Sequence, residues 1–320
     1  MSQPKIELHV HLEGSVRPAS LLEIARRNDV PLPVDTVEEL AKLYEYTDFS
    51  QFIKVWLMTT QCLRTADDFR RITVEYAEEA AGFGAVYLEA VCSPAQWVAF
   101  GQATWDEMLT GYVEGAAEAR DRFGVTVAFT PDLYRGLDPA IAEECARVCV
   151  RYRDLGVVGL GIGGPEKDMS IEPYRTAFAI ARDGGLGVVP HSGEADGPAS
   201  MREVLTLDPD RLRHGIRAVE DADLLAEIVE RGLVLDVCPT SNLRTGVVPS
   251  LAEHPLPRLR AAGVPCTINT DDPAMFGTDL EREYEVAAEL GVSAEEAFAA
   301  GVAGALCDDA TRAGLLALAQ

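Results

Sequence analysis

The chain has 320 residues, and 48% of them are hydrophobic, which supplies a sizeable core and excludes wholesale disorder. Asp and Glu number 52 against 28 Lys and Arg, so the formal net charge is -24 at pH 7. Such a surface repels nucleic acid and anionic membranes, and neither is expected as a partner. No signal-peptide pattern or membrane-length apolar run is found, and the seven cysteines are odd in number without CxxC spacing. This predicts reduced thiols in a cytoplasmic protein.

Short β-branched apolar runs alternate with longer amphipathic stretches along the chain, which predicts strands and helices in turn. Helices such as 104–123 and 138–155 are expected between the strands, with glycines at their C-terminal joints. About eight such units predict a closed parallel (β/α)8 TIM barrel. The strands are expected at 5–11, 86–92, 125–130, 157–162, 186–191, 211–216, 233–238 and 265–270.

Two segments exceed what a simple barrel needs. Residues 18–81 are too long for one crossover helix, and we expect extra helices there to cap the C-terminal mouth of the barrel. The tail 293–320 is predicted to form a helical pair. No linker, low-complexity tract or repeat divides the chain, so residues 1–320 are predicted to form a single barrel domain.

Polar motifs follow several of the predicted strands. In the run 8–14, His9 and His11 lie two residues apart on a strand, so both imidazoles point to one side and can reach one metal ion. His191 ends a later strand, and Asp271 follows the last one. The C-terminal ends of all strands meet on one face of a barrel. Three histidines and one aspartate suit zinc, with a water as nucleophile.

Each motif alone also has a structural interpretation. Core histidines are commonly satisfied by hydrogen bonds, and an Asp before Pro often starts a helix. His214 has the weakest signal by itself, but its position on a strand of the same set favours a catalytic role. His254 precedes a helix-like run and is predicted to be a loop or packing residue. Pro165, in the glycine-rich run 159–165, removes a backbone donor that a phosphate would need, which argues against a nucleotide-binding loop.

An ordered set of motifs resembles the adenosine deaminase family of the amidohydrolase superfamily, over almost the whole chain. The motifs are LHVHLEG (8–14), SP (93–94), VVGLGIGG (157–164), HSGE (191–194), RHG (213–215), CPTSN (238–242) and NTDDP (269–273). The resemblance implies hydrolytic deamination of a 6-aminopurine nucleoside to the 6-oxopurine and ammonia. It also implies one Zn2+ per chain, held by His9, His11, His191 and Asp271.

The same resemblance implies roles for the remaining site residues. Glu194 would protonate the purine N1 while water attacks C6, and His214 would orient or deprotonate that water. Asp272 would hydrogen-bond to the nucleophile or to N7, and the Gly164 N–H would contact N3. Glu13, and with it Ser93, is expected in the substrate-binding set.

Two departures from the family pattern bear on the substrate. Typical adenosine deaminases have LDG after the second histidine, with the Asp holding the ribose, where this chain has the longer Glu13. Their usual Asp at the end of strand 4 is replaced by Gly161. We favour an adenosine with a bulky 5′ substituent, of which 6-aminodeoxyfutalosine in the futalosine route to menaquinone is the best-known case. Adenosine or deoxyadenosine is the alternative, and adenine is less favoured. A benzoate substituent would need a cation, for which Arg17, Arg135 and Arg244 are available.

Two further alternatives follow from the scaffold. A two-metal amidohydrolase would need a carboxylated Lys or a Glu at the end of strand 4. Lys167 lies beyond that strand, while Glu166 leaves the alternative open, and one metal is predicted. A purine-binding relative without turnover is expected to have lost Glu194 or a metal ligand, and all of these are present. The sequence therefore predicts an enzyme with a small nucleoside substrate, and no residue pattern in it specifies an oligomeric state.

Overall fold

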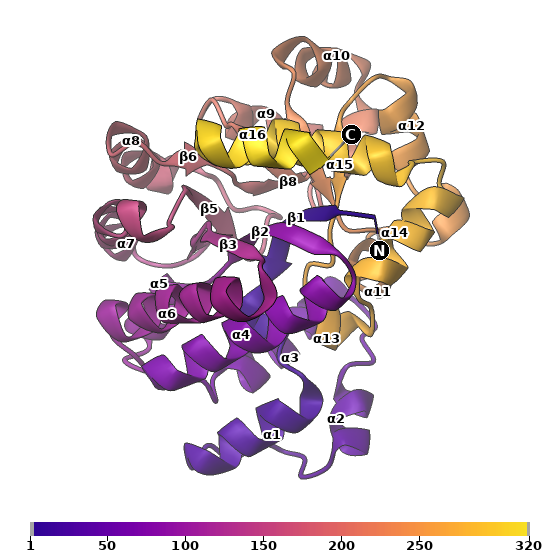
Figure 1. Cartoon of the computed structure of the whole chain (residues 1–320). Helices are drawn as coiled ribbons and strands as arrows, with labels where there is room; N and C mark the ends of the chain where they lie inside the picture. The colour runs from indigo at the N-terminus through magenta and orange to yellow at the C-terminus, as the bar shows by residue number, and fades with distance from the viewer. Residues whose placement is uncertain (1–2, 319–320) are drawn as a thin grey trace.

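Parallel strands follow one another around a closed barrel in the computed structural model, which describes residues 3–318 (Figure 1). All paired strands in that range are parallel, and isolated bridges complete the ring: Phe129 pairs with Val157, and Val10 pairs with Asp271. The predicted (β/α)8 class is confirmed. The strands are β1 (Lys5–His11), β2 (Ala85–Val91), β3 (Thr126–Phe129), β4 (Asp132–Tyr134), β5 (Gly159–Gly163), β6 (Gly187–Val188), β7 (His191–Ser192), β8 (Arg211–His214), β9 (Val234–Val237) and β10 (Cys266–Ile268).

A proline divides the predicted strand 186–191, and another proline follows the predicted strand 125–130, beyond which pairing continues as β4. Pro131 separates β3 from β4, and Pro190 separates β6 from β7. Proline has no N–H to donate to the ladder, so regular pairing stops there and resumes beyond it. The carbonyls of both prolines still accept hydrogen bonds from the next strand, at 2.9 Å from Gly161 and 3.0 Å from Arg213. The barrel therefore stays closed, and the resumed segments carry functional side chains.

A bulge in β1 directs its histidines. The register against β2 shifts between Glu7 and Val10, and the N–H groups of Leu8 and His9 both donate to Asn269 Oδ1, at 2.8 and 3.1 Å. Simple alternation would place His9 on the same face as Glu7. Instead, Glu7 bonds to Tyr76 of α4, whereas His9 faces the mouth of the barrel. A bulge that redirects a side chain beside a functional site is a recurrent device.

Helices surround the barrel and begin at clear sequence signals. The predicted helix 104–123 is α6, with a capping box between Thr104 and Glu107, and 138–155 contains α7, with Asp138 as its N-cap. α7 ends earlier than predicted, at Arg151, before a 3-10 turn that leads to Gly156. The helices between strands β2 and β10 are α5 (Pro94–Ala99), α6 (Trp105–Phe123), α7 (Pro139–Arg151), α8 (Arg175–Asp183), α9 (Pro198–Leu205), α10 (Ala222–Arg231), α11 (Pro239–Arg244) and α12 (Leu256–Ala261). After β10 come α13 (Pro273–Phe276) and α14 (Leu280–Glu289).

The long segment between β1 and β2 contains several helices. They are α1 (Pro18–Arg27), α2 (Val37–Leu43), α3 (Phe49–Thr60) and α4 (Ala66–Gly82). α4 packs against β2 and α6, as a crossover helix of the barrel does, while α1 and α2 project from the bottom of the view in Figure 1. α3 contributes four side chains to the cavity at the site, described below. The extra length thus supplies one wall of the functional site.

The tail forms the predicted pair of helices, α15 (Ala294–Gly304) and α16 (Asp309–Leu318). α15 packs on β1 and β10, and its Phe298 and Val302 join Ile6 and Leu8 in a buried cluster at the N-terminal half of β1. The opposite, C-terminal ends of the strands are left open for the site. All seven cysteines are free thiols. Within residues 3–318, no helix combines the length and apolarity that crossing a membrane requires.

Candidate active site

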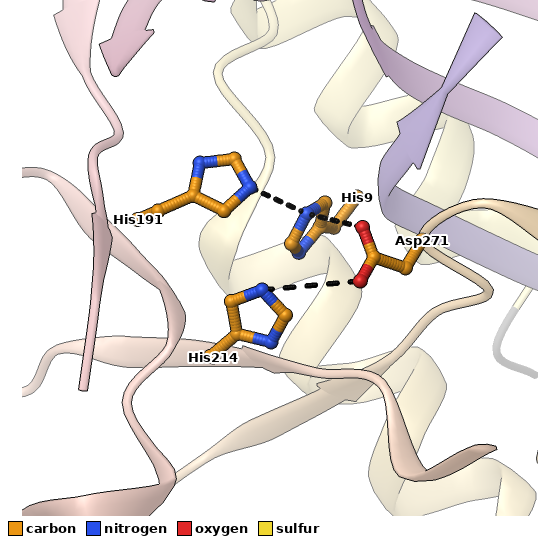
Figure 2. Close-up of side chains that lie close together, drawn as sticks. All are labelled: His9, His191, His214 and Asp271. Atoms are coloured by element: carbon orange, nitrogen blue, oxygen red, sulfur yellow. Dashed lines mark hydrogen bonds and ion pairs between the residues drawn. The ribbon is translucent and has the colours of Figure 1, made fainter. Parts of the chain in front are cut away.

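Histidine and aspartate side chains from distant parts of the chain converge at the mouth of the barrel. Nε2 of His191 lies 3.0 Å from Nε2 of His9 and 3.2 Å from Nε2 of His11. Oδ1 of Asp271 lies 3.3 Å from Nε2 of each of these two β1 histidines. Figure 2 shows His9, His191, His214 and Asp271 pointing toward one another. The predicted metal ligands, which are His9, His11, His191 and Asp271, therefore lie together in space, and His214 lies beside them.

Four of the six separations between these donor atoms, at 3.0–3.3 Å, match those of a tetrahedral divalent cation site. Zinc binds histidine nitrogen and carboxylate oxygen at about 2.0–2.2 Å, which separates tetrahedral ligand atoms by about 3.3 Å. Nδ1 of His191 lies 3.1 Å from the carbonyl oxygen of Ile162, so its N–H donates there and the lone pair on Nε2 faces the other donors. Burial lowers the pKa of His9 and of His191 well below the ordinary value, which keeps these imidazoles neutral, as ligands must be.

Two non-glycine residues at the site have left-handed backbone conformations. His214 has φ 61° and Asp271 has φ 64°. Such a conformation is uncommon outside glycine and persists only where surrounding contacts hold it. The Asp271 backbone is held by paired hydrogen bonds with β1: its N–H donates to His9 at 3.1 Å, and its carbonyl accepts from His11 at 2.6 Å. Its carboxylate accepts from Ser241 Oγ at 2.6 Å. The contacts that close the barrel therefore also orient the aspartate.

A carboxyl group suited to donate a proton lies beside this cluster. Oε2 of Glu194 is 3.6 Å from Nε2 of His214, which in turn is 3.9 Å from Oδ2 of Asp271. Burial raises the pKa of Glu194 well above its usual range, and the negative charges of Asp271 and Glu166 add to the effect. Burial also lowers the pKa of His214 to about 4. A neutral acid and a neutral imidazole thus face one another, a pairing that can run acid–base chemistry near neutral pH.

Asp272 is held by a residue that the sequence did not single out. The indole N–H of Trp56, on α3, donates to its Oδ1 at 2.8 Å. A Cβ at Gly14 would lie 1.7 Å from the same oxygen, so only glycine leaves room for this carboxyl group. Burial, followed by the charge of Asp271, raises the pKa of Asp272 well above its ordinary value. The expected role of Asp272 is thus coupled to the additional helices between β1 and β2.

An ion pair beneath His191 was also missed. Oδ2 of Asp132 lies 3.2 Å from Nδ1 of His191, and Asp132 also accepts from the Arg213 guanidinium. A Cβ at Gly161 would lie 2.2 Å from the Asp132 carboxylate and 2.3 Å from Arg213. Gly161 stands where the family usually has an Asp, and the space that a side chain at this position would need is occupied by the Asp132–Arg213 pair. In the sequence, the only signal for a role of Asp132 at the site is its position just after a predicted strand.

A cavity at the site opens over these groups. Its wall contains Ser93 and Gly164, as predicted, together with aromatic and aliphatic residues that the sequence did not identify. At Gly164, φ is +85° and a Cβ would lie 2.7 Å from the Tyr134 ring, so the position requires glycine. The lining residues that were missed are Phe49, Phe52, Ile53 and Trp56 on α3, Gln96 on α5, and Asp132, Leu133, Tyr134 and Gly163.

Glu13 differs from its expected place in the substrate-binding set. It is not among the residues that line the cavity. Its Oε1 instead accepts from the Ser93 N–H at 2.7 Å and from the Tyr112 hydroxyl at 2.9 Å, and burial raises its pKa to about 7. The longer side chain reaches α6 and the start of α5, so Glu13 positions the cavity residue Ser93 from behind.

The three arginines considered for a benzoate do not line the cavity either. Arg17 lies between Glu78 and Glu79 on α4. Arg135 is buried and donates to the His191 carbonyl at 2.7 Å. Arg244, on α11, is exposed and donates to the carbonyl of Tyr44 at 2.7 Å.

Other polar residues have structural contacts. Oε2 of Glu166 accepts from three backbone N–H groups of residues 194–196, and Lys167 is exposed, so neither is placed to bridge two metals at the donor cluster. His254 contacts Asn242 Oδ1 at 3.2 Å and accepts from the Leu256 N–H, which confirms its predicted packing role.

Comparisons with known proteins agree with this geometry. The family model named adenosine deaminase matches residues 4–319. The aminodeoxyfutalosine deaminase of Acidothermus cellulolyticus is 55% identical over 314 residues, which cover 96% of this chain and 88% of that protein.

Solved structures show the same fold. An adenine deaminase from Arthrobacter aurescens superimposes with a TM-score of 0.93 at 29% identity, covering 99% of this chain and 98% of that one. An amidohydrolase from Burkholderia ambifaria, solved with bound zinc, gives a TM-score of 0.88 at 27% identity, covering 98% and 89%. With a family match over nearly its whole length and a relative at 55% identity, the chain belongs to the adenosine deaminase family.

Proposed function

We propose that this deaminase converts 6-aminodeoxyfutalosine, a 6-aminopurine nucleoside with a benzoate-bearing 5′ group, to its 6-oxopurine and ammonia. The observation that carries this substrate is the 55% identity with the aminodeoxyfutalosine deaminase of Acidothermus cellulolyticus, over nearly the full chain.

We assign the zinc ligands to His9, His11, His191 and Asp271. One bound Zn2+ would supply a water activated as a nucleophile near neutral pH. The converging nitrogen and carboxylate atoms support this assignment, as does the bound zinc of the Burkholderia ambifaria relative.

The protein's own groups then account for the proton movements. Glu194, buried and neutral, donates its proton to the purine N1, which makes C6 electrophilic. His214 orients the attacking water, and Asp272 accepts a hydrogen bond from that nucleophile or faces N7. The backbone N–H of Gly164 contacts N3. Water adds at C6, and one of its protons passes by way of His214 to the exocyclic nitrogen, which then leaves C6 as ammonia. The second water proton returns to Glu194 as the C6 carbonyl forms, while the proton first donated by Glu194 stays on N1.

The wall formed by α3 supports an aryl substituent on the substrate. Phe49, Phe52 and Trp56 line one side of the cavity. Aromatic side chains contribute large apolar contact areas and favour offset or edge-on packing with another ring. A sugar carrying an aryl group could extend along this wall away from the metal-binding residues, whereas adenine alone would leave it uncovered.

Among the arginines considered, we propose Arg244 as the cation nearest the carboxylate of such a substituent. Phe52 of the cavity wall packs edge-on against Tyr46, with ring centroids 5.4 Å apart. Arg244 donates to Tyr44, two residues before Tyr46, and within residues 3–318 it has no carboxylate partner. Arg17 is already paired with carboxylates on α4.

The variant Arg244→Ala tests this assignment. KM for 6-aminodeoxyfutalosine should rise about tenfold or more, while KM for adenosine, which lacks the carboxylate, should stay the same. Arg17→Ala is the matched control and should change neither value. Equal effects of Arg244→Ala on both substrates would exclude Arg244 as the anion-binding residue.

The substrate itself is tested by kcat/KM for 6-aminodeoxyfutalosine, adenosine and adenine, with ammonia release followed in the zinc-loaded enzyme. A preference of about a hundredfold for the first corresponds to about 2.7 kcal/mol of transition-state binding from the 5′ group. The adenine deaminase with a TM-score of 0.93 makes adenine the second candidate. A preference for adenine or adenosine would replace the proposed substrate without changing the chemistry.

A further inference from the structure

The segment 191–196 carries two groups that must be held relative to each other. His191 is a proposed metal ligand at its start, and Glu194 is the proposed proton donor three residues later. Between them, Gly193 has φ +72°, a conformation that other residues rarely adopt. Apart from β7 (His191–Ser192), which pairs with β8, this segment lies outside regular secondary structure. Its geometry therefore depends on side chains that bind its backbone.

Two buried side chains of opposite charge bind the two ends of this segment. Arg135, which directly follows β4, donates to the carbonyl oxygen of His191 at 2.7 Å. Glu166, which follows β5, accepts at one oxygen from the N–H groups of Glu194, Ala195 and Asp196, at 3.0, 2.7 and 2.9 Å. Glu166 is 1% exposed and Arg135 is 2% exposed, and neither lines the cavity.

We propose that Arg135 and Glu166 are a pair of positioning residues that set the distance between the metal-binding imidazole and the proton donor. Three consecutive N–H groups directed at one carboxylate form an anion-binding concavity, and charge-assisted bonds of this kind are stronger than neutral ones. The Glu166 carboxylate fixes the backbone of Glu194, and the Arg135 guanidinium fixes that of His191. The inference rests on the proposed function, because it depends on His191 being a metal ligand and Glu194 being the proton donor.

Glu166→Ala tests the proton-donor end. The N–H groups of residues 194–196 should lose their protection against hydrogen exchange, because their acceptor is gone. A displacement of about 1 Å at a reacting group costs about 10²-fold in rate, so kcat should fall by about that factor. Zinc content should stay at one equivalent, and KM should change less than about threefold.

Two companion variants sharpen the result. Glu166→Gln keeps an acceptor oxygen at the same reach and should restore the exchange protection and most of kcat. Lys167→Ala, the exposed neighbour in the same loop, should leave both unchanged. Should Glu166→Ala fail to fold, Glu166→Asp, whose carboxylate is one methylene short of the N–H groups, makes the same test.

A double variant separates positioning from general support of the fold. In a Glu194→Gln background the proton donor is already lost, so adding Glu166→Ala should reduce kcat no further. An additional hundredfold loss there, or unchanged exchange protection in Glu166→Ala, would overturn the proposal. If Glu194→Gln alone kept normal turnover, the proposed catalytic role of Glu194 would fail instead, and the exchange measurement would still decide the contact.

The His191 end of the segment is tested by measuring zinc retention. Arg135→Met should release the His191 carbonyl and weaken zinc retention against a chelator by roughly 10- to 100-fold, as loss of an outer contact to a ligand commonly does. Arg135→Lys keeps the charge and one donor and should retain zinc better than Arg135→Met. Zinc retention in Arg135→Met equal to that of the unmodified protein would exclude a positioning role for Arg135.

Discussion

At the scale of single residues, environment divides chemically similar side chains between different roles. Asp271 and Asp272 are neighbours, yet His9 and the other imidazoles hold the pKa of Asp271 well below its usual range despite its burial. Burial and the charge of Asp271 raise the pKa of Asp272 and of Glu194. One carboxylate is therefore ionised, as a metal ligand must be, and the others are neutral and can donate hydrogen bonds or protons.

Glu194→Gln should keep one equivalent of zinc and lose at least about 10³-fold in kcat, because it removes the proton donor while preserving the shape of the side chain. Single-turnover kinetics together with metal analysis check both parts. His9→Ala provides the contrast, since it should lose the metal along with activity. Near-normal turnover in Glu194→Gln would refute the assigned mechanism.

Asp132→Asn tests the ion pair beneath His191. The change removes the charge that faces Nδ1 of His191 and leaves the buried Arg213 without its carboxylate partner. Zinc affinity, measured by chelator competition, should fall by roughly tenfold or more. Asp236→Asn, at a buried aspartate paired with Arg211 away from the cavity, is the control. If both variants bind zinc as the unmodified protein does, Asp132 has no influence on the metal site.

At the scale of elements, α3 links the additional helices to the chemistry. Its N-cap is Asp48, and its face toward the barrel presents Phe52 and Trp56 to the cavity. The indole N–H of Trp56 reaches Asp272 on the segment after β10. One wall of the cavity and the orientation of the Asp272 carboxyl group thus depend on one helix.

Trp56→Phe should lower kcat/KM about tenfold, since a hydrogen bond to a buried carboxyl group contributes about 1.4 kcal/mol and the aromatic wall is preserved. Steady-state kinetics on the preferred nucleoside measure the effect. Trp97→Phe is the matched control: Trp97 donates to the Leu63 carbonyl at 3.1 Å and does not line the cavity. A similar kinetic loss in both variants would argue against a specific contact with Asp272.

At the scale of the whole molecule, Arg211 connects several strands of the barrel through hydrogen bonds at the end opposite the site. Its guanidinium lies inside the barrel, bonded to Glu89 of β2 at 2.8 Å and to Asp236 of β9 at 2.6 Å. It also donates to the Leu8 carbonyl on β1 and to Gly304, the last residue of α15. One buried side chain of β8 thus contacts three other strands and the helix that packs across them.

Arg211→Met should lower the free energy of unfolding by about 3–5 kcal/mol, because it leaves two buried carboxylates without their partner. Chemical denaturation followed by circular dichroism measures the loss. The exposed helical pair of Arg147 and Glu143 offers the comparison, and Arg147→Met should leave the midpoint unchanged. A shift no larger than that of Arg147→Met would show that the charges inside the barrel are compensated elsewhere.

The sequence by itself was sufficient to predict the barrel and the convergence of the residues proposed to bind the metal. Strand and helix periodicities are local, and parallel strands in a barrel must bring their C-terminal ends to one face, so His9, His191 and Asp271 could be placed together without coordinates. The tertiary structure decided the bulge that redirects His9, the contacts of Asp132 and Trp56, and the burial of Glu13 behind Ser93. These features depend on which side chains from distant segments fill the same buried space and form its hydrogen bonds. Local periodicity reports only on neighbouring residues, so it could not predict these long-range contacts.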